Sequence, residues 1–559
     1  MGTFLNLFLI ALGSCLLFLA GFFLYGRLIA KYFALSPLQK TPAHTLNDGV
    51  DYVPAKAPLL LSQHFSAIAA AGPIVGPILA GLWFGWLPAL LWIVLGSIFL
   101  GAVHDFSSLV GSVRHKARSI VEIVRDHLGP RAHLLFMGFV WLSLIYVIIA
   151  FTDLTSASFV EPIYGGAVAS SSFLYLIAAI VMGGCLYKFR MPLRVATLLF
   201  VPIVGFIIWF GQYIPLSLPA VGSIRPQLLW NGVILTYCLV ASVIPMWLLL
   251  QPRGYLGGFF LYLALLAGIV GLFLGGDAIQ YPAFLGFRSA QGLPLFPMLF
   301  VTVACGACSG FHGIVASGTT SKQIDQEPDC HLVGYGGMLL EGLVAVVALS
   351  TLMVLAKGDP ETLQSPDRIY ASGLSHFVER FGVNGHFAKS FALLAFATFI
   401  YDTLDVATRL GRYIFQELTG WRGSAGRIGA TVCTLALPAF CVSLSVKDAA
   451  GNVIPAWKIF WTIFGTSNQL LAALTLLTLT VWLKRSGKPW WPSAIPTLFM
   501  LAMTLWALLL LMRPWVAGFL RGHWTMNWIV LIAAILLVLA ASLLREAFKA
   551  LTLPLPSSK

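Results

Sequence analysis

The sequence predicts an all-α polytopic membrane protein with about fifteen spanning helices. Of its 559 residues, 59% are hydrophobic and only 10% are charged, and the mean hydropathy is +0.89. A water-soluble globular chain contains a much larger share of charged residues. Apolar runs of 18 or more residues recur from end to end. Each is long enough to cross a bilayer core of about 30 Å at a rise of about 1.5 Å per residue.

The apolar runs define the expected elements in order. No basic residue precedes the first run, so we expect a retained helix there rather than a cleaved signal peptide. The expected spans are residues 5–26, 64–86, 88–113, 133–151, 172–187, 195–215, 229–250, 255–274, 295–316, 332–355, 387–407, 428–446, 456–483, 493–512 and 525–544.

The positive charges are distributed as expected for a membrane protein. The net charge is +13, but 24 of the 34 Lys and Arg residues lie in alternate loops rather than in one patch. Cytoplasmic loops are enriched in Lys and Arg, so the pattern predicts an outside N-terminus and a cytoplasmic C-terminus. It argues against nucleic acid as a partner. No phosphate-binding loop occurs, which disfavours ATP-driven transport.

Two spans contain helix breakers. The span 64–86 carries Gly72-Pro73 and Gly76-Pro77, and the span 295–316 carries glycines at Gly306, Gly310 and Gly313. Unsatisfied backbone survives at membrane depth only inside protein or beside a wet cavity. Small residues also allow close helix packing, which is the alternative interpretation.

The charge pattern predicts that these two spans cross the membrane in opposite directions. Secondary transporters commonly place one broken helix in each inverted half and bind substrate between them. We therefore favour a substrate site built from the two breaks. The candidate substrate-binding residues are His64, Ala71, Gly72, Pro73, Gly76, Gly306, Ser309, Gly310, His312 and Gly313.

Ionisable side chains within spans cost roughly 2.5–3.5 kcal/mol each on insertion scales, so each needs a partner or a purpose. Asp402 and Asp405 share a helix face with Arg409, and this spacing predicts that one of them pairs with that arginine. If Asp405 is the partner, Asp402 is left with the raised pKa that a proton carrier needs. We expect Asp405, together with Asp402, to carry the proton. A structural ion pair is the alternative. The candidate proton-coupling residues are His104, Asp105, Glu341, Asp402, Asp405 and Arg409.

Polar side chains also suggest a cation site. Hydroxyl and amide groups at Thr403, Thr408, Ser467 and Asn468 are suited either to Na⁺ or to helix packing. No zinc-binding or nucleophile motif occurs, and the lone Cys305-Gly-Ala-Cys308 pair is weak evidence for metal or redox chemistry. We expect no cofactor, no bound metal and no enzymatic activity.

Several segments closely resemble the carbon-starvation protein A family over roughly residues 45–475. The matching segments are residues 48–54, 64–73, 101–106, 309–312, 318–322, 334–341, 405–409 and 465–473. The resemblance implies a bacterial inner-membrane uptake system with a five-plus-five inverted-repeat core like that of the leucine transporter. It also implies import of peptides, or of pyruvate with protons, under nutrient limitation.

The resemblance divides the chain into five parts. We expect an extra helix in 1–45, the first repeat in 46–228, an inserted helix pair in 229–294, the second repeat in 295–484 and extra helices in 485–559. Gln63, His104 and Asp402 depart from the family pattern, which puts transfer of its ion coupling in question.

Taken together, these observations favour a proton-driven symporter for a small carboxylate or short peptide. Three alternatives stay open: Na⁺ coupling on the same fold, a transporter-like nutrient sensor without net flux, and, more remotely, an intramembrane metalloenzyme. The lipid bilayer and the transported solute are the expected partners, and the sequence indicates no oligomeric state.

Overall fold

A computed structural model describes residues 6–48, 52–245, 247–444, 446–447, 453–522 and 528–552. Residues 49–51 of the first family segment lie outside this part. The described chain is a helical bundle with one short hairpin, formed by β1 (Val446–Lys447) and β2 (Val453–Ile454). Fourteen of its helices are long and apolar enough to cross a membrane, and a bent helix pair supplies a fifteenth span. The predicted all-α polytopic class is confirmed.

The first part of the chain forms thirteen α-helices and two π-helical segments that matter below. They are α1 (Leu7–Ala20), α2 (Arg27–Phe33), α3 (Pro42–Thr45), α4 (Ala57–Ile68), α5 (Gly72–Phe84), α6 (Trp86–Gly96), η2 (Ser97–Gly101), α7 (Ala102–Arg114), α8 (Ile120–Leu128), α9 (Pro130–Phe159), α10 (Gly165–Tyr187), α11 (Leu193–Phe210), α12 (Pro226–Val243), α13 (Leu250–Leu274) and, joining α1 to α2, η1 (Gly21–Gly26).

The remaining helices follow in the same way. They are α14 (Leu295–Val303), η4 (Ala304–Gly306), α15 (Gly310–Gly318), η5 (Thr320–Lys322), η6 (His331–Gly336), α16 (Gly337–Met353), α17 (Pro366–Glu379), α18 (Gly385–Thr419), α19 (Gly423–Ser443), α20 (Ala456–Arg485), α21 (Trp491–Leu520) and α22 (Trp528–Thr552).

One order of elements occurs twice along the chain. In the first series, α4 to α11, a broken span is followed by a span with a π-helical segment, the short helix α8, the long helix α9 and two more spans. In the second series, α14 to α20, the same order runs through η4, η6, α17 and α18. Each π-helical segment packs against a helix of the other series: η2 packs on α16, and η6 packs on α7. This is the internal repetition expected of a five-plus-five core.

The two broken spans run antiparallel beside each other. The first half of one, α4, packs against the second half of the other, α15, while α5 packs against α14 and η4. The α4–α5 pair bends by 51° at its break. This opposite direction is the relation that inverted repeats impose.

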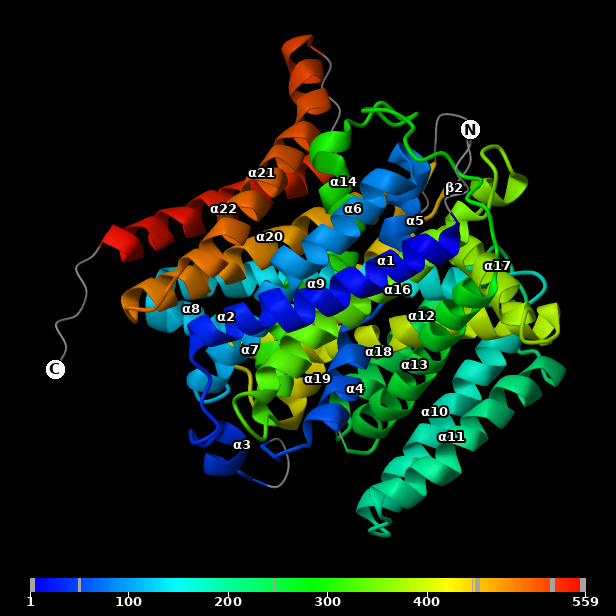
Figure 1. Ribbon diagram of the computed structural model, residues 1–559, viewed down its shortest axis with the longest axis horizontal. Coiled ribbons are helices and arrows are strands. Elements are labelled where there is room, and N and C mark those ends of the chain that lie inside the picture. Colours follow the sequence, from blue (N-terminus) through cyan, green and yellow to red (C-terminus); the bar gives the residue numbers. More distant parts are fainter. Residues whose placement is uncertain are drawn as a thin grey trace.

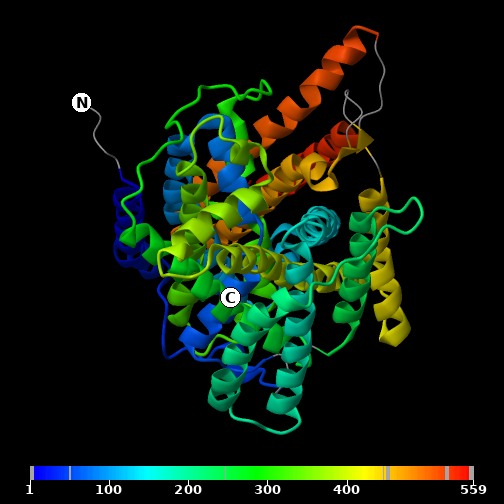
Figure 2. The ribbon, with the colours of Figure 1, turned by 90° about the vertical axis from the view of Figure 1, so that its right-hand side faces the viewer.

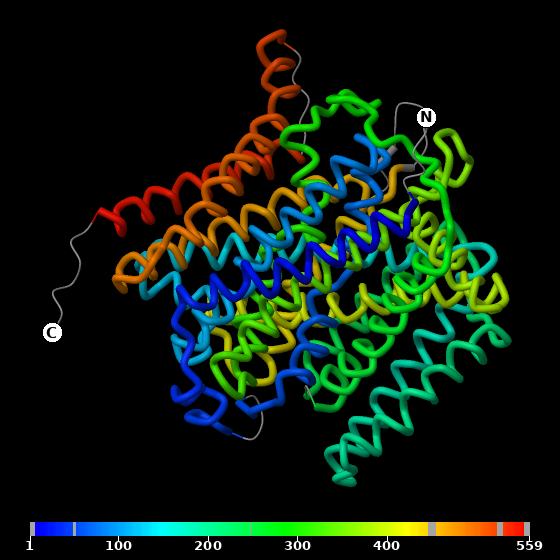
Figure 3. Tube along the Cα trace, viewed as in Figure 1, coloured from blue at the N-terminus to red at the C-terminus, as the bar shows by residue number. Residues whose placement is uncertain are grey.

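Long helices α9 and α18 pack on each other inside the bundle. The spans Leu295–Lys322 and Ala456–Arg485 each contain an 18-residue window in which every residue is buried. The first helix, α1, runs along the outside of the bundle, as Figure 3 shows. Helices α10 and α11 project from the end of the bundle that lies opposite to α21 and α22 (Figures 1 and 2). The breaks therefore lie among the most protected elements.

A glycine at the first break permits the close contact between the spans. A Cβ atom on Gly76 would lie 2.6 Å from the carbonyl oxygens of Thr302 and Val303, which are backbone atoms that cannot easily move. We predict that Gly76→Ala lowers the free energy of unfolding by about 1–3 kcal/mol, measured by denaturation of the purified protein. Gly138→Ala on α9, where nothing lies within 4 Å, is the control. Equal stability of the two variants would contradict this packing.

A histidine pair ties α8 to the end of α7. The Nε2 atoms of His115 and His127 lie 2.9 Å apart, and His115 Nδ1 lies 2.7 Å from the carbonyl oxygen of Gly111. The carbonyl accepts from Nδ1–H, so the Nε2 atom of a neutral His115 accepts from His127. Burial and the neighbouring His115 lower the pKa of His127 from 6.5 to about 4, since both disfavour its charged form.

This pair predicts a pH dependence. Between pH 6.5 and about 4 the unfolded His127 binds a proton that the folded one does not, so the docked state of α8 loses stability as the pH falls through this window. Amide protection factors in residues 120–128, which correct the measured exchange for its intrinsic rate at each pH, should be lower at pH 5 than at pH 7. His127→Gln should flatten that difference; an unchanged difference in the variant would show that another group is responsible.

Candidate functional site

The second break is strained and is held by a side chain from α20. Ala304 has φ +39° and ψ −100°, a conformation that L-residues rarely adopt. Asn468 Oδ1 accepts from the Phe311 backbone N–H at 2.9 Å, and its Nδ2 donates to Ser309 Oγ at 3.0 Å and to Cys305 Sγ at 3.2 Å. Asn468 therefore satisfies one backbone N–H at the N-terminus of α15 and joins both sides of the break. Strain of this kind clusters at functional sites.

The substrate-binding candidates lie at the two breaks. Ala71 precedes α5 directly, while Gly72, Pro73 and Gly76 form its first turns. A Cβ atom on Gly72 would lie 2.5 Å from Cys305, so the two breaks touch. Gly306, Ser309, Gly310 and Gly313 follow on the other side, and all eight residues are buried. The structure thus brings these candidates together, and their role in binding stays a prediction.

Four side chains form what we call the histidine cluster: His104, Asp105, His312 and Glu341. Asp105 lies between the two histidines, with Oδ1 2.7 Å from His104 Nδ1 and Oδ2 2.8 Å from His312 Nδ1. The other ring nitrogen of His312 lies 3.0 Å from Glu341 Oε2. All four side chains are fully buried. His312 follows the second break, whereas Asp105 and Glu341 follow the π segments η2 and η6.

With a neutral His104 and a protonated His312, the histidine cluster carries one more negative than positive charge. His104 Nε2 has no hydrogen-bond partner in the described part of the chain, so a neutral His104 donating from Nδ1 satisfies its contact. A protonated His312 then faces two carboxylates, which leaves one negative charge in excess. An unpaired buried charge is costly, and one further proton removes it. The cluster is therefore suited to bind and release a proton.

His64 is placed on α4, next to the histidine cluster but outside its hydrogen bonds. Its Nδ1 lies 2.9 Å from Thr320 Oγ1, and its Nε2 has no hydrogen-bond partner among the described residues. Asp105 and His312 lie within electrostatic reach. His64 therefore links α4 to the segment that follows α15.

Three charged side chains form a second group, the arginine cluster: Arg253, Asp402 and Asp405. Arg253 Nη1 pairs with Asp405 Oδ2, and its Nη2 lies 3.0 Å from Asp402 Oδ1. Tyr237 donates to Asp405 Oδ2 at 2.8 Å, and Ser66 donates to Asp402 Oδ2 at 3.0 Å. The cluster joins α13 and α18 to α12 and to the broken span's first half, α4.

The predicted pairing of Asp405 with Arg409 is wrong. Arg409 instead donates to the carbonyl oxygens of Ala241 and Ile244, at 2.6 and 2.8 Å, where α12 ends. Carbonyls at a helix C-terminus lack intrahelical donors, so a buried arginine finds acceptors there. The positive charge beside the two aspartates of α18 comes from another helix, because Arg253 of α13 pairs with both of them.

The four candidate cation ligands lie on two helices. Thr403 and Thr408 are on α18, and Ser467 and Asn468 are on α20, while α9 packs against both helices. Thr403 and Ser467 donate to carbonyls of their own helices, and Asn468 is engaged at the second break. The structure does not bring these residues into one set of ligands.

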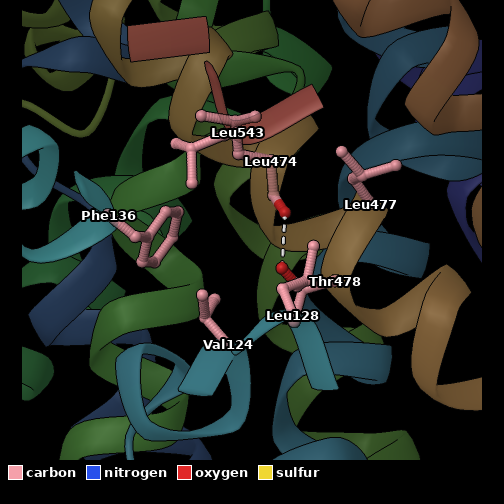
Figure 4. A pocket seen from close by; sticks show the side chains of 7 residues that line it. All are labelled: Val124, Leu128, Phe136, Leu474, Leu477, Thr478 and Leu543. Atoms are coloured by element: carbon pink, nitrogen blue, oxygen red, sulfur yellow. Dashed lines mark hydrogen bonds between the residues drawn. The ribbon is translucent and has the colours of Figure 1, made fainter. Parts of the chain in front are cut away.

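No group of three or more His, Cys, Asp or Glu side chains is placed to hold a metal ion within the described ranges. Cys305 and Cys308 are free and buried. A small apolar pocket lies elsewhere, between α8, α9, α20 and α22, as the close-up shows (Figure 4). Leu474 and Thr478 line it, and the dashed line is the Thr478 hydroxyl donating to the carbonyl of Leu474 at 2.9 Å. It holds no ionisable side chain.

Sequence reasoning missed Arg253, Tyr237, Ser66 and Thr320. Arg253 lay in a segment assigned to a short loop, because the expected span began at residue 255, whereas α13 begins at Leu250. An arginine within a span is costly enough to have indicated a buried partner. Hydroxyl groups such as those of Ser66 and Thr320 are common in membrane helices, so no sequence signal distinguishes them.

The cap at the second break is testable. Asn468→Leu removes the acceptor for the Phe311 N–H, and leaving a buried donor unsatisfied costs about 1–3 kcal/mol. We therefore expect a lower free energy of unfolding, measured by thermal or denaturant unfolding of the purified protein. Thr475→Val on the same helix is the control, because its buried hydroxyl has no hydrogen-bond partner in the described part. A variant as stable as this control would rule out the capping role.

Solved structures and curated sequences were both compared with this chain. Among solved structures, a mutant manganese transporter of Eremococcus coleocola is 14% identical, with TM-score 0.44 over 90% of this chain and 98% of that one. MhsT in complex with L-phenylalanine is 13% identical, with TM-score 0.44 over 89% and 99%.

Sequence relatives are more informative. The peptide transporter CstA of Mycobacterium tuberculosis H37Rv is 31% identical over 91% of this chain and 76% of its own length, and that of Campylobacter jejuni is 32% identical over 92% and 81%. The pyruvate/proton symporter BtsT of Escherichia coli K12 is 29% identical over 91% and 82%. The family model for carbon starvation protein CstA matches residues 6–370 and 362–507. The chain is thus a multi-pass membrane transporter that belongs to the carbon starvation protein CstA family.

Proposed function

We propose that this transporter is a proton symporter that imports a small carboxylate, such as pyruvate, or short peptides during nutrient limitation. The names of its relatives support these substrates, and one relative is named a proton symporter. The observation that carries proton coupling is His312, which lies beside the second break and between two buried carboxylates. A proton bound there is placed next to the proposed substrate pocket.

We assign the substrate pocket to the backbone of residues 71–76 and 306–313, with His64 at its edge. Helix N-termini at Gly72 and Gly310 favour the carboxylate of the solute, since they carry partial positive charge. The histidine cluster and the arginine cluster then hold the coupled protons. Bulk water is excluded from both clusters, because their side chains are almost wholly buried.

The two repeats, their boundaries at 46–228 and 295–484, and the orientation are part of the same proposal. The loop charges support an outside N-terminus and a cytoplasmic C-terminus in a bacterial inner membrane. Na⁺ coupling is the rival, but its four expected ligands, Thr403, Thr408, Ser467 and Asn468, lie on two helices and do not form one set.

Transport by reconstituted protein tests the proposal. Proteoliposomes should exchange labelled pyruvate or labelled dialanine, and an inward proton gradient, with no Na⁺ present, should drive accumulation. His312→Gln should abolish gradient-driven accumulation, because it removes the charge that balances Asp105 and Glu341. The control is His386→Gln, an exposed histidine at the start of α18.

Three results would contradict the proposal. Accumulation driven only by a Na⁺ gradient would replace protons by Na⁺ as the coupling ion. Binding of either probe without flux would indicate a sensor. Full proton-driven accumulation by the His312 variant would remove the histidine cluster from the mechanism.

A further inference from the structure

Arg253 lies on α13, which belongs to neither of the two repeated series of helices, and several contacts fix its position. It is 2% exposed, and its guanidinium lies over the rings of Tyr237 and Tyr401, at 5.6 and 5.4 Å from their centres. The hydroxyl of Tyr175 donates to the carbonyl of Arg253 at 2.6 Å. These contacts hold both the backbone and the side chain of Arg253 in place.

Two glycines bring the inserted helix α13 close to the functional elements. Gly257 faces Asp402 Oδ2, and a Cβ atom on Gly258 would lie 2.7 Å from Ser62 Oγ on α4. Helix α13 therefore contacts the first half of the broken span and the aspartate helix α18 together. It is part of the site rather than an addition to the outside of the bundle.

The charges of the arginine cluster do not balance. One guanidinium faces two carboxylates, which leaves one negative charge in excess in a buried site. The other titratable or charged groups that face it are the neutral Tyr175 on α10, Tyr237 and Cys238 on α12, and Tyr401 and Arg409 on α18. Arg409 keeps its positive charge but donates to carbonyls of α12 rather than to either aspartate, and α4 presents Ser66. One proton on the aspartate pair therefore neutralises the cluster.

We propose that Arg253 is a positioning residue that limits the aspartate pair to one exchangeable proton and places that proton on Asp402. This inference rests on the proton symport proposed above. Asp405 receives the aligned hydrogen bonds of Arg253 and Tyr237, whereas Arg253 Nη2 faces Asp402 at 3.0 Å without hydrogen-bond alignment. Asp405 is thus the better-stabilised carboxylate, and Asp402 is the group that takes the proton.

The proton on Asp402 would act on the broken span through Ser66. A hydroxyl donates a stronger hydrogen bond to a carboxylate than to a neutral carboxyl group. Protonation of Asp402 therefore weakens the tie between α18 and α4. Because His64 extends from another side of the same short helix to Thr320, a displacement of α4 would also act on the segment that follows α15.

Replacing Arg253 separates proton coupling from substrate movement. In Arg253→Met both aspartates hold protons permanently, so exchange of labelled pyruvate or dialanine should continue while accumulation driven by the proton gradient falls to the level of exchange alone. The rate should also lose the pH profile of the unaltered protein.

Arg253→Lys keeps the charge and should recover part of the gradient response. Arg412→Met is the matched control, because Arg412 is 2% exposed and donates to the carbonyl of Ser242 at 2.6 Å rather than to a carboxylate.

The outcomes distinguish the two proposals. If the unaltered protein shows gradient-driven accumulation and Arg253→Met shows it with the same pH profile, the role of Arg253 is wrong and the symporter stands. If the unaltered protein exchanges solute without any response to the gradient, the symporter itself is wrong. Should Arg253→Met fail to fold, the double variant Arg253→Met with Asp405→Asn takes its place, because it removes one charge of each sign. Its transport is compared with that of the unaltered protein by the same two criteria.

Discussion

Exclusion of water from the membrane is the constraint on which this structure depends. An interrupted helix exposes peptide groups that lipid cannot satisfy. The two interrupted spans lie antiparallel, so each break is covered by the other. Asn468 supplies an acceptor for the Phe311 N–H at the start of α15 and donates to Ser309 Oγ before it. Glycines at the contacts allow this approach, because a Cβ atom on Gly72 or Gly76 would meet the opposite span.

The same constraint governs the buried charges. Both clusters contain two carboxylates, and neither contains enough positive charge to balance them with a neutral His104. Helix α4 lies between them, since His64 reaches towards one side and Ser66 donates to Asp402 on the other. A short helix that ends at a break is well placed to move as a unit. In the proposed mechanism, proton binding and solute binding both act on α4.

Much of the fold could be predicted because its signals are local. Each expected span corresponds to an observed helix or broken helix, since apolar length alone identifies a spanning segment. Glycines marked both breaks, with prolines at the first, and the rarity of buried charge identified His312, Glu341 and Asp402. These residues are brought together by helices far apart in the sequence.

The partners of those residues could not be predicted in the same way. Spacing of three and four residues suggested that Arg409 pairs with Asp405, because that rule considers one helix only. Arg253 pairs with Asp405 from α13, which begins at Leu250 rather than at the expected residue 255. Arg409 lies beside the end of α12, where free carbonyls accept its hydrogen bonds. Tertiary packing decides which partner each buried arginine takes, and residue spacing within one helix does not indicate that packing.

The central claim is that each cluster holds a proton because its carboxylates exceed its positive charge. Infrared difference spectroscopy of the purified protein across a pH titration measures protonated carboxyl groups directly. The account predicts carboxyl bands that shift in D₂O, one lost in Asp402→Asn and another lost in Glu341→Gln. A titration without protonated carboxyl bands, or bands that persist unchanged in both variants, would contradict it.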